Sequence, residues 1–269
     1  ATFSKFTPPA NTGLGFLDAV SDADILLFAD SLDADADGIS GVPNWIPLIK
    51  EYVTLRPNSV DHVGKYFGRF GKKGATYDLL QQTATAYNQD IGITSTYEPF
   101  DTHSGDLFDP EISNQTIQDV VFYLKTLKAP VPRKDDSEII ICKQLFTTVG
   151  CVKCHRSEFT TGDVGIPALS NKTFYPYTDL LLHDMGPGLD DGYTEGSAKT
   201  SEWRTPPLWG LGLSKDSQGG EYFLLHDGRA RSIQEAILLH GGEGSLSKNN
   251  FQSLTSDEKQ KLIRFLESL

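Results

Sequence analysis

The chain has few residues that would cross-link it or anchor it in a membrane. Its 269 residues include three cysteines and one methionine. Three cysteines are too few for the disulfide framework of a small secreted domain. No apolar run approaches the roughly 18 residues that a membrane-spanning helix needs, so we expect no membrane span. The length fits one large domain or two modest ones.

Positive charge is also scarce. The chain carries 24 Lys and Arg against 36 Asp and Glu, a formal net charge of −12, and its pI is about 4.9. Such a surface disfavours nucleic acid and anionic membranes as partners. It would suit a basic partner protein, although solvated acidic surfaces are common without one.

Two of the three cysteines belong to one motif. Residues 151–155 read C-V-K-C-H, the C-x-x-C-H attachment signature of c-type haem. Cys151 and Cys154 can form thioether bonds to the two vinyl groups of one porphyrin, and His155 can bind the iron as proximal ligand. A zinc site would need a second ligand pair, and the following His argues against a thioredoxin-like redox pair. We therefore predict one covalent haem c, which leaves Cys142 as a buried thiol or, alternatively, a reactive one.

The ligand on the opposite face of the iron decides what such a haem does. A bound Met favours electron transfer, whereas an open position favours small-molecule chemistry. Met185 is the only methionine and lies in a Gly- and Pro-rich loop, so we predict it as the sixth ligand. The alternative is a Met that fills the core. His183, His226 and His240 are the competing ligands.

Several basic and aromatic residues are candidates for the surroundings of the haem. Arg204 and Arg229 would pair with the propionates, since a planar guanidinium matches a carboxylate; ordinary salt bridges are the alternative. A basic, Gly-rich stretch at residues 64–74 lacks the ending of a phosphate loop and could meet the propionates too. Trp203 and Trp209 are expected in the pocket wall or core.

An acidic loop near the N-terminus resembles half of an EF-hand. Asp33, Asp35 and Asp37 alternate ahead of Gly38, which places three carboxylates around one position for a hard cation. The twelfth position holds Asn44 in place of the bidentate Glu. The loop is thus a possible calcium site, or else a solvated turn rich in Asp.

Apolar periodicity predicts a mainly α protein. Helices are expected over residues 23–29, 77–89, 113–127, 138–147 and 255–269, the last with a capping box at its start, whereas residues 1–20 are expected to be irregular. Prolines at 130 and 132 mark a boundary. We predict an N-terminal lobe at 1–132 without a haem motif and a cytochrome c-like haem domain at 133–269, both with long irregular loops and a similar closing helix.

Several longer motifs occur together. They are T-D-L-L-L-H-D-M-G at 178–186, W-R-T-P-P-L-W-G at 203–210, L-H-D-G-R-A at 225–230, H-G-G-E at 240–243, D-x-D-x-D-G-I-S-G at 33–41 and G-R-F-G at 68–71. From about Gly13 to its end the chain resembles the di-haem oxidoreductase family, which is related to bacterial cytochrome c peroxidases and MauG. Members usually carry a further N-terminal haem lobe with its own C-x-x-C-H. This chain has one such motif. We therefore expect that the second haem, where one is needed, comes from a further N-terminal haem lobe or from a partner subunit.

These observations predict a mono-haem c protein of the periplasm or cell exterior, since haem c is attached outside the bacterial cytoplasm. The expected function is electron transfer with a redox partner protein. The alternative is a peroxidase-like oxidoreductase acting on peroxide or on a partner protein. A docking subunit with a structural haem is a third reading.

Overall fold

Helices dominate the structure, as predicted. The computed structural model describes residues 3–133 and 137–269. The longer helices are α3 (Leu79–Ile91), α4 (Asn114–Thr126), α5 (Ser137–Val149), α8 (Ser245–Ser253) and α9 (Ser256–Glu267). The shorter ones are α1 (Leu14–Asp18), α2 (Asp22–Leu26), α6 (Ser214–Ser217), α7 (Ile233–Leu239) and the 3-10 turns η1 (Cys151–Lys153), η2 (Leu211–Leu213) and η3 (Gly242–Gly244). None of the helices in the described residues is long and apolar enough to cross a membrane.

The helices begin where the sequence supplies caps. The side chains of Asp78 and Ser113 accept hydrogen bonds from the first turns of α3 and α4. Thr255 and Glu258 form the predicted capping box at the start of α9. The five predicted helices are confirmed to within a few residues. The prediction that residues 1–20 are irregular is wrong at α1, a single turn that packs against α4.

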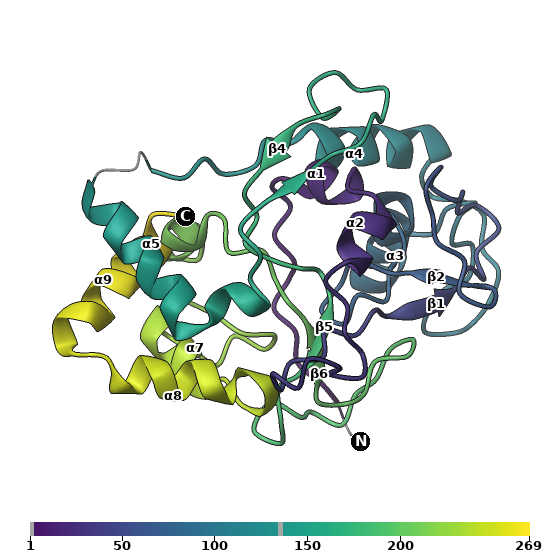
Figure 1. Ribbon diagram of the computed structural model, residues 1–269. Coiled ribbons are helices and arrows are strands. Elements are labelled where there is room, and N and C mark those ends of the chain that lie inside the picture. The colour runs from purple at the N-terminus through teal and green to yellow at the C-terminus, as the bar shows by residue number, and fades with distance from the viewer. Residues whose placement is uncertain (1–2, 134–136) are drawn as a thin grey trace.

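The strands are short and antiparallel. β1 (Trp45–Pro47) pairs with β2 (Lys65–Phe67), and β3 (Phe159–Thr160) pairs with β4 (Thr173–Phe174). β5 (Leu182–Asp184) pairs with β6 (Glu202–Arg204), which sets His183 opposite Trp203. Figure 1 shows β5 and β6 between the helices α1–α4 on one side and α5, α7, α8 and α9 on the other. A further bridge from Val42 to Leu182 ties the N-terminal part of the chain to β5.

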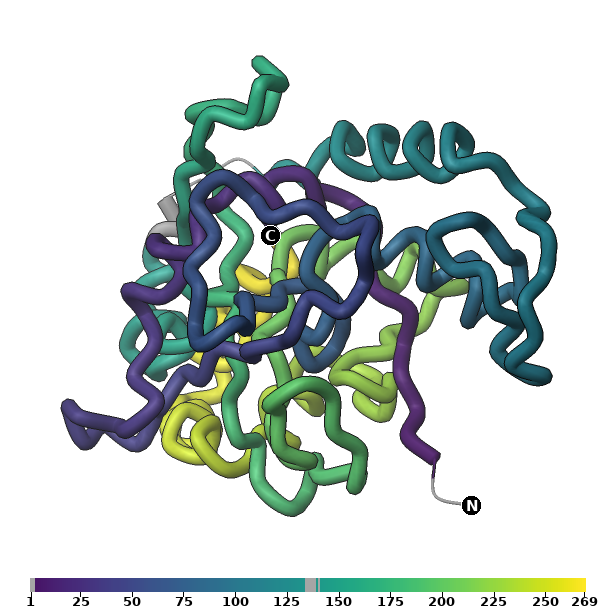
Figure 2. Tube along the Cα trace, turned by 90° about the vertical axis from the view of Figure 1, so that its right-hand side faces the viewer, coloured from purple at the N-terminus to yellow at the C-terminus, as the bar shows by residue number. Residues whose placement is uncertain are grey.

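Two apolar cores lie on the two sides of β5 and β6. One is built around Ile25, Phe67 and Ile117, and the other around Phe146 and Phe265. The first core also contains residues from beyond the predicted lobe boundary at 132, namely Phe159, Phe174, Leu180, Leu181 and Trp209. Packing therefore crosses that boundary. In both Figure 1 and Figure 2 the green segment around residues 155–180 runs beside the purple segment that contains α1 and α2, and Gly162 N–H donates to the Ala19 carbonyl.

A short G-L-G turn occurs in each half and makes the same contacts. Gly13 N–H donates to the Leu127 carbonyl just after α4, and Gly210 N–H donates to the Leu269 carbonyl just after α9. A Cβ on Gly15 would lie 1.9 Å from the Lys125 carbonyl oxygen, and one on Gly212 would lie 1.9 Å from that of Glu267. Only glycine allows this approach. A G-L-G turn therefore contacts the end of α4 and the end of α9 in the same way.

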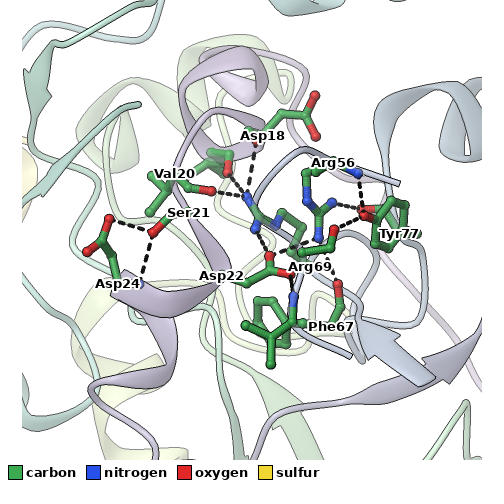
Figure 3. Close-up of polar contacts among 12 residues, drawn as sticks. Asp18, Val20, Ser21, Asp22, Asp24, Arg56, Phe67, Arg69 and Tyr77 are labelled. Atoms are coloured by element: carbon green, nitrogen blue, oxygen red, sulfur yellow. Dashed lines mark hydrogen bonds and ion pairs between the residues drawn. The ribbon is translucent and has the colours of Figure 1, made fainter. Parts of the chain in front are cut away.

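A buried ionic network holds the G-R-F-G segment (Figure 3). Arg69 is fully buried and donates to the carbonyls of Leu17 and Val20 and to the Asp22 carboxylate. Arg56 donates to the same carboxylate at 3.0 Å and stacks over the Tyr77 ring. Two guanidinium groups share one buried carboxylate, so loss of Asp22 would leave the fully buried Arg69 without its ion-pair partner. The network fixes the loop that follows Arg69.

Candidate haem c site

A cavity of about 380 Å³ opens between the two cores. Its wall is shared by the C-x-x-C-H motif, β5 and β6, the loop after Arg69, and the segment from α7 to α8. The lining residues that matter below are Lys72, Cys151, Cys154, His155, His183, Met185, Trp203, Arg204, His226, His240 and Glu243. The cavity is mostly apolar, with a few polar groups, as is usual for cofactor sites.

His155 lines this cavity, and a hydrogen bond fixes one of its ring nitrogens. Its Nδ1 lies 2.9 Å from the Tyr177 carbonyl oxygen, to which it donates. This bond leaves Nε2 as the unprotonated, ligating nitrogen. Burial lowers the pKa of His155 to about 4, so the imidazole is neutral at physiological pH. The donor set therefore fits an axial ligand of haem iron.

The two cysteines of the motif lie beside His155 and also line the cavity. Both are partly buried and neither forms a disulfide. Burial raises the pKa of Cys151 to about 12 and also raises that of Cys154, so both are neutral thiols. The pair and the adjacent His155 fit covalent attachment of one haem c. Cys142 is buried in the second core and does not line the cavity, in agreement with the buried thiol that we predicted.

His183 is bound from both sides by carboxylates. Its Nε2 lies 2.9 Å from Asp179 and its Nδ1 lies 2.6 Å from Glu243 and 3.5 Å from Cys154 Sγ. Burial opposes a charge, but the Asp179 carboxylate and these hydrogen bonds raise the pKa of His183 well above its usual value. Both ring nitrogens are occupied. His183 therefore has no nitrogen to offer to iron.

Met185 and His240 are neighbours on the cavity wall. A Cβ on Gly244 would lie 3.4 Å from Met185 Cε and 3.1 Å from His240 Cδ2. His240 Nδ1 lies 2.7 Å from the Ala236 carbonyl oxygen, which leaves its Nε2 available. Burial lowers the pKa of His240, so this imidazole is neutral too. Two side chains with ligating chemistry therefore lie together in the cavity.

Arg204 and Lys72 are cations on the cavity wall, and neither has a carboxylate partner within the described residues. Arg204 Nε donates to the Gly71 carbonyl, and Lys72 Nζ donates to Thr7 Oγ1 at 2.7 Å. Burial lowers the pKa of Arg204 to about 10; burial and the nearby Arg204 lower the pKa of Lys72 to about 8. Haem propionates would neutralise this pair. The basic Gly-rich stretch does reach the cavity, but sequence alone did not single out Lys72.

Arg229 is not brought to this cavity. Its exposed guanidinium pairs with Asp227 at 2.7 Å and donates to the Gly188 carbonyl. The ordinary salt bridge is therefore what the structure shows for Arg229. Trp203 lines the cavity and Trp209 belongs to both the cavity wall and the first core, as expected.

The acidic loop folds differently from a regular EF-hand half. Asp33 and Asp35 come together with Asp30, each offering an oxygen within 4.8 Å of the others. Asp37 turns away and pairs with Lys153 of the haem motif at 2.8 Å. Asp30 was missed because it precedes the alternating pattern. The calcium site stays a prediction, with Asp30 in the place that we had given to Asp37.

Comparison with known families decides the class. The family model described as "Di-haem oxidoreductase, putative peroxidase" matches residues 6–269. The chain belongs to the di-haem oxidoreductase family. This membership supports haem c as cofactor, although the family is named for two haems and this chain carries one attachment motif.

Two solved structures are distantly similar to the chain. Hydrazine synthase of Kuenenia stuttgartiensis is 16% identical, with 100% of this chain and 96% of that chain covered and a TM-score of 0.42. A MauG-like protein associated with microbial copper homeostasis is 15% identical, with 99% and 94% covered and a TM-score of 0.42. No curated protein matches this oxidoreductase.

Proposed function

We propose that this di-haem-family oxidoreductase is a haem c enzyme of the periplasm or cell exterior that uses peroxide to oxidise a donor. The family match favours this peroxidase-like reading over the simple mono-haem electron transfer that the sequence first suggested. The observation that supports the site best is that His155 lines the same cavity as Cys151 and Cys154, with its Nδ1 bound to the Tyr177 carbonyl and its Nε2 left as the unprotonated nitrogen.

Different residues of the cavity would hold different parts of the cofactor. Cys151 and Cys154 would attach it and His155 would bind its iron, while Lys72 and Arg204 would pair with its propionates. Haem c, when bound, supplies one-electron chemistry at iron. The protein supplies orientation, burial and electrostatics.

Glu243 is the group best placed to handle a proton. Burial would raise its pKa, but hydrogen bonds from His183 and Ser40 outweigh burial and hold the pKa below its ordinary value. Glu243 is therefore a carboxylate at neutral pH, and its oxygens lie 2.6 Å from His183 Nδ1 and 2.6 Å from Ser40 Oγ. It lines the cavity and can accept a proton from a substrate there.

Electron transfer without peroxide chemistry is the second candidate. It is favoured by one observation, the adjacent Met185 and His240 on the cavity wall. We retain Met185 as the proposed sixth ligand for this function, with His240 as its competitor. His226 stacks on Trp203 and is the less suitable of the histidines.

Peroxide turnover separates the two functions. The holoprotein is mixed with hydrogen peroxide and a chromogenic electron donor, and donor oxidation is followed by absorbance. We expect peroxide-dependent turnover that falls at least tenfold in Glu243→Gln, because the proton acceptor is lost. Asp257→Asn, an exposed change on α9, is the control and should leave turnover unchanged. A low-spin holoprotein that reacts with donors but turns over no peroxide would favour electron transfer.

A further inference from the structure

Aromatic rings join the haem cavity to the protein surface. Trp203 and His226 line the cavity and stack on each other, with centroids 3.7 Å apart and planes within 6°. The Phe6 ring packs edge-on against Trp203 at 5.8 Å, and Tyr193 packs edge-on against Phe6 at 5.5 Å. Trp203 is 6% exposed, whereas Phe6 is 41% and Tyr193 39% exposed. The series therefore runs from a buried site to solvent.

Trp203 is held rigidly in this series. Its Nε1 donates to the Leu189 carbonyl at 2.8 Å, and Lys73 Nζ lies 3.7 Å from the centre of its ring. Lys73 Nζ donates in turn to the carbonyls of Lys199, Thr200 and Glu202. A cation against the indole disfavours loss of an electron from the ring. Trp203 is thus suited to pass electrons by tunnelling and not to become a radical.

The exposed end of the series is surrounded by carboxylates. Asp190, Asp191 and Glu195 flank Tyr193 on one loop, and none of them pairs with a cationic side chain within the described residues. Asp191 instead accepts from Ser4, which fixes the segment bearing Phe6, and Tyr193 Oη donates to Glu195.

Nearby cations do not cancel this charge. Lys199 pairs with Glu202, and Arg229 pairs with Asp227. The exposed Lys5 beside Phe6 and the buried Lys73, which interacts electrostatically with Asp191, Glu195 and Asp190, add two positive charges. Three carboxylates against these two cations leave the rim net negative. Figure 1 shows that the N-terminal segment lies close to β6, the strand that carries Trp203.

We propose that the exposed edge of Phe6 and Tyr193, with its rim of Asp190, Asp191 and Glu195, is where a basic electron-donor protein docks. The proposal rests on the proposed function, since peroxide reduction consumes electrons that a donor must supply. In each encounter one electron passes from the reduced metal centre of the donor to the oxidised haem of this chain. The donor is oxidised by one electron, and no bond forms or breaks.

Stopped-flow electron exchange with a basic cytochrome c as probe tests the docking surface. The holoprotein and the probe are mixed in the redox states that make exchange run downhill, over a range of ionic strengths. The rim variant Asp190→Asn/Asp191→Asn/Glu195→Gln is compared with Asp90→Asn/Asp106→Asn/Asp109→Asn, which removes the same charge from exposed positions elsewhere. We expect the rim variant to lower the second-order rate constant about tenfold at low salt and the control to change it less than twofold.

The path and the docking surface have separate readouts. Tyr193→Leu should slow exchange with the probe severalfold even at high salt, whereas Tyr123→Leu, a change at a more exposed tyrosine on α4, should not. Reduction by ascorbate, a small donor that needs no docking, should be the same in all variants. Equal effects of the rim and control variants on the probe would overturn the proposal. Loss of peroxide turnover with normal exchange would instead count against the proposed function alone.

Discussion

At the scale of single residues, hydrogen bonds to Nδ1 distinguish the histidines of the cavity. His155 and His240 each have Nδ1 fixed by a backbone carbonyl and keep Nε2 available. His183 has both nitrogens bound by carboxylates. The sequence singles out His155 through its motif but does not distinguish His183 from His240, because the carboxylate of Glu243 reaches His183 only through the fold.

Met185→Ala tests the sixth ligand. If Met185 binds the iron, the oxidised wild type is low spin with a weak near-infrared sulfur-to-iron band, and the variant loses that band and has a lower potential. Near-infrared absorbance and a redox titration are the measurements, with His240→Ala as the matched variant. A band-free wild type whose spectrum changes only in His240→Ala would assign the position to His240.

Lys72 should make the stability of the protein depend on pH, and this dependence should differ between the haem-free protein and the holoprotein. Its folded pKa of about 8 lies below the ordinary 10.5, so the folded state binds fewer protons than the unfolded state between those values. When no anion is bound in the cavity, the charged Lys72 lowers the free energy of unfolding by its full amount below pH 8. The free energy of unfolding should therefore rise between pH 8 and about 10.5. Lys72→Met should remove this rise and stabilise the haem-free protein near pH 7 by on the order of 2 kcal/mol.

Thermal melts of a Cys151→Ala/Cys154→Ala protein, with and without Lys72→Met, measure this effect. In the holoprotein the propionates should compensate the charge, and Lys72→Met should instead lower the potential by roughly 50 mV. Parallel pH profiles with and without Lys72 would show that the lysine is not buried against the cavity.

At the scale of elements, the two G-L-G turns hold the closing helices. Gly15→Ala and Gly212→Ala would each place a methyl group against a carbonyl oxygen 1.9 Å away, which the backbone must move to relieve. Each should lower the free energy of unfolding by about 1–3 kcal/mol. Gly188→Ala, which meets no atom within 4 Å, should change it little. Chemical denaturation measures all three, and similar midpoints would refute the close approach.

The acidic loop is the element whose ligand is still a prediction. If Asp30, Asp33 and Asp35 hold calcium, chelator should lower the thermal midpoint, because an ion bound only by the folded state stabilises it. Asp33→Asn should abolish the chelator effect, with Asp90→Asn as control. Metal analysis without calcium, together with an unchanged midpoint, would leave a solvated turn.

Elements were predicted well where a local signal exists. The capping box at Thr255 and the periodicity of α4 depend on neighbours in the sequence, so their helices were found. The three short sheets were missed, since strands of two or three residues such as β5 carry no periodicity. The sequence likewise identified Cys151, Cys154 and His155 through one contiguous motif, whereas Lys72 and Glu243 reach the cavity from distant segments.

At the scale of the whole molecule, a cavity lies between two cores, and the first core contains residues from both sides of the predicted boundary at 132. A G-L-G turn contacts the end of α4 and the end of α9 in the same way, yet one C-x-x-C-H motif is present. Basic side chains are fewer than acidic ones, and Lys72 and Arg204 line the cavity without a carboxylate partner among the residues that the structure describes. The molecule therefore concentrates uncompensated positive charge where an anionic cofactor would lie.

Covalent attachment of haem at Cys151 and Cys154 is the central claim. Mass spectrometry of the denatured holoprotein measures it directly, alongside acid-acetone extraction. We predict that the polypeptide keeps the mass of one haem, and that Cys154→Ala attaches it poorly or through a single bond. Complete extraction of haem from the wild type, leaving a polypeptide of unmodified mass, would contradict the account.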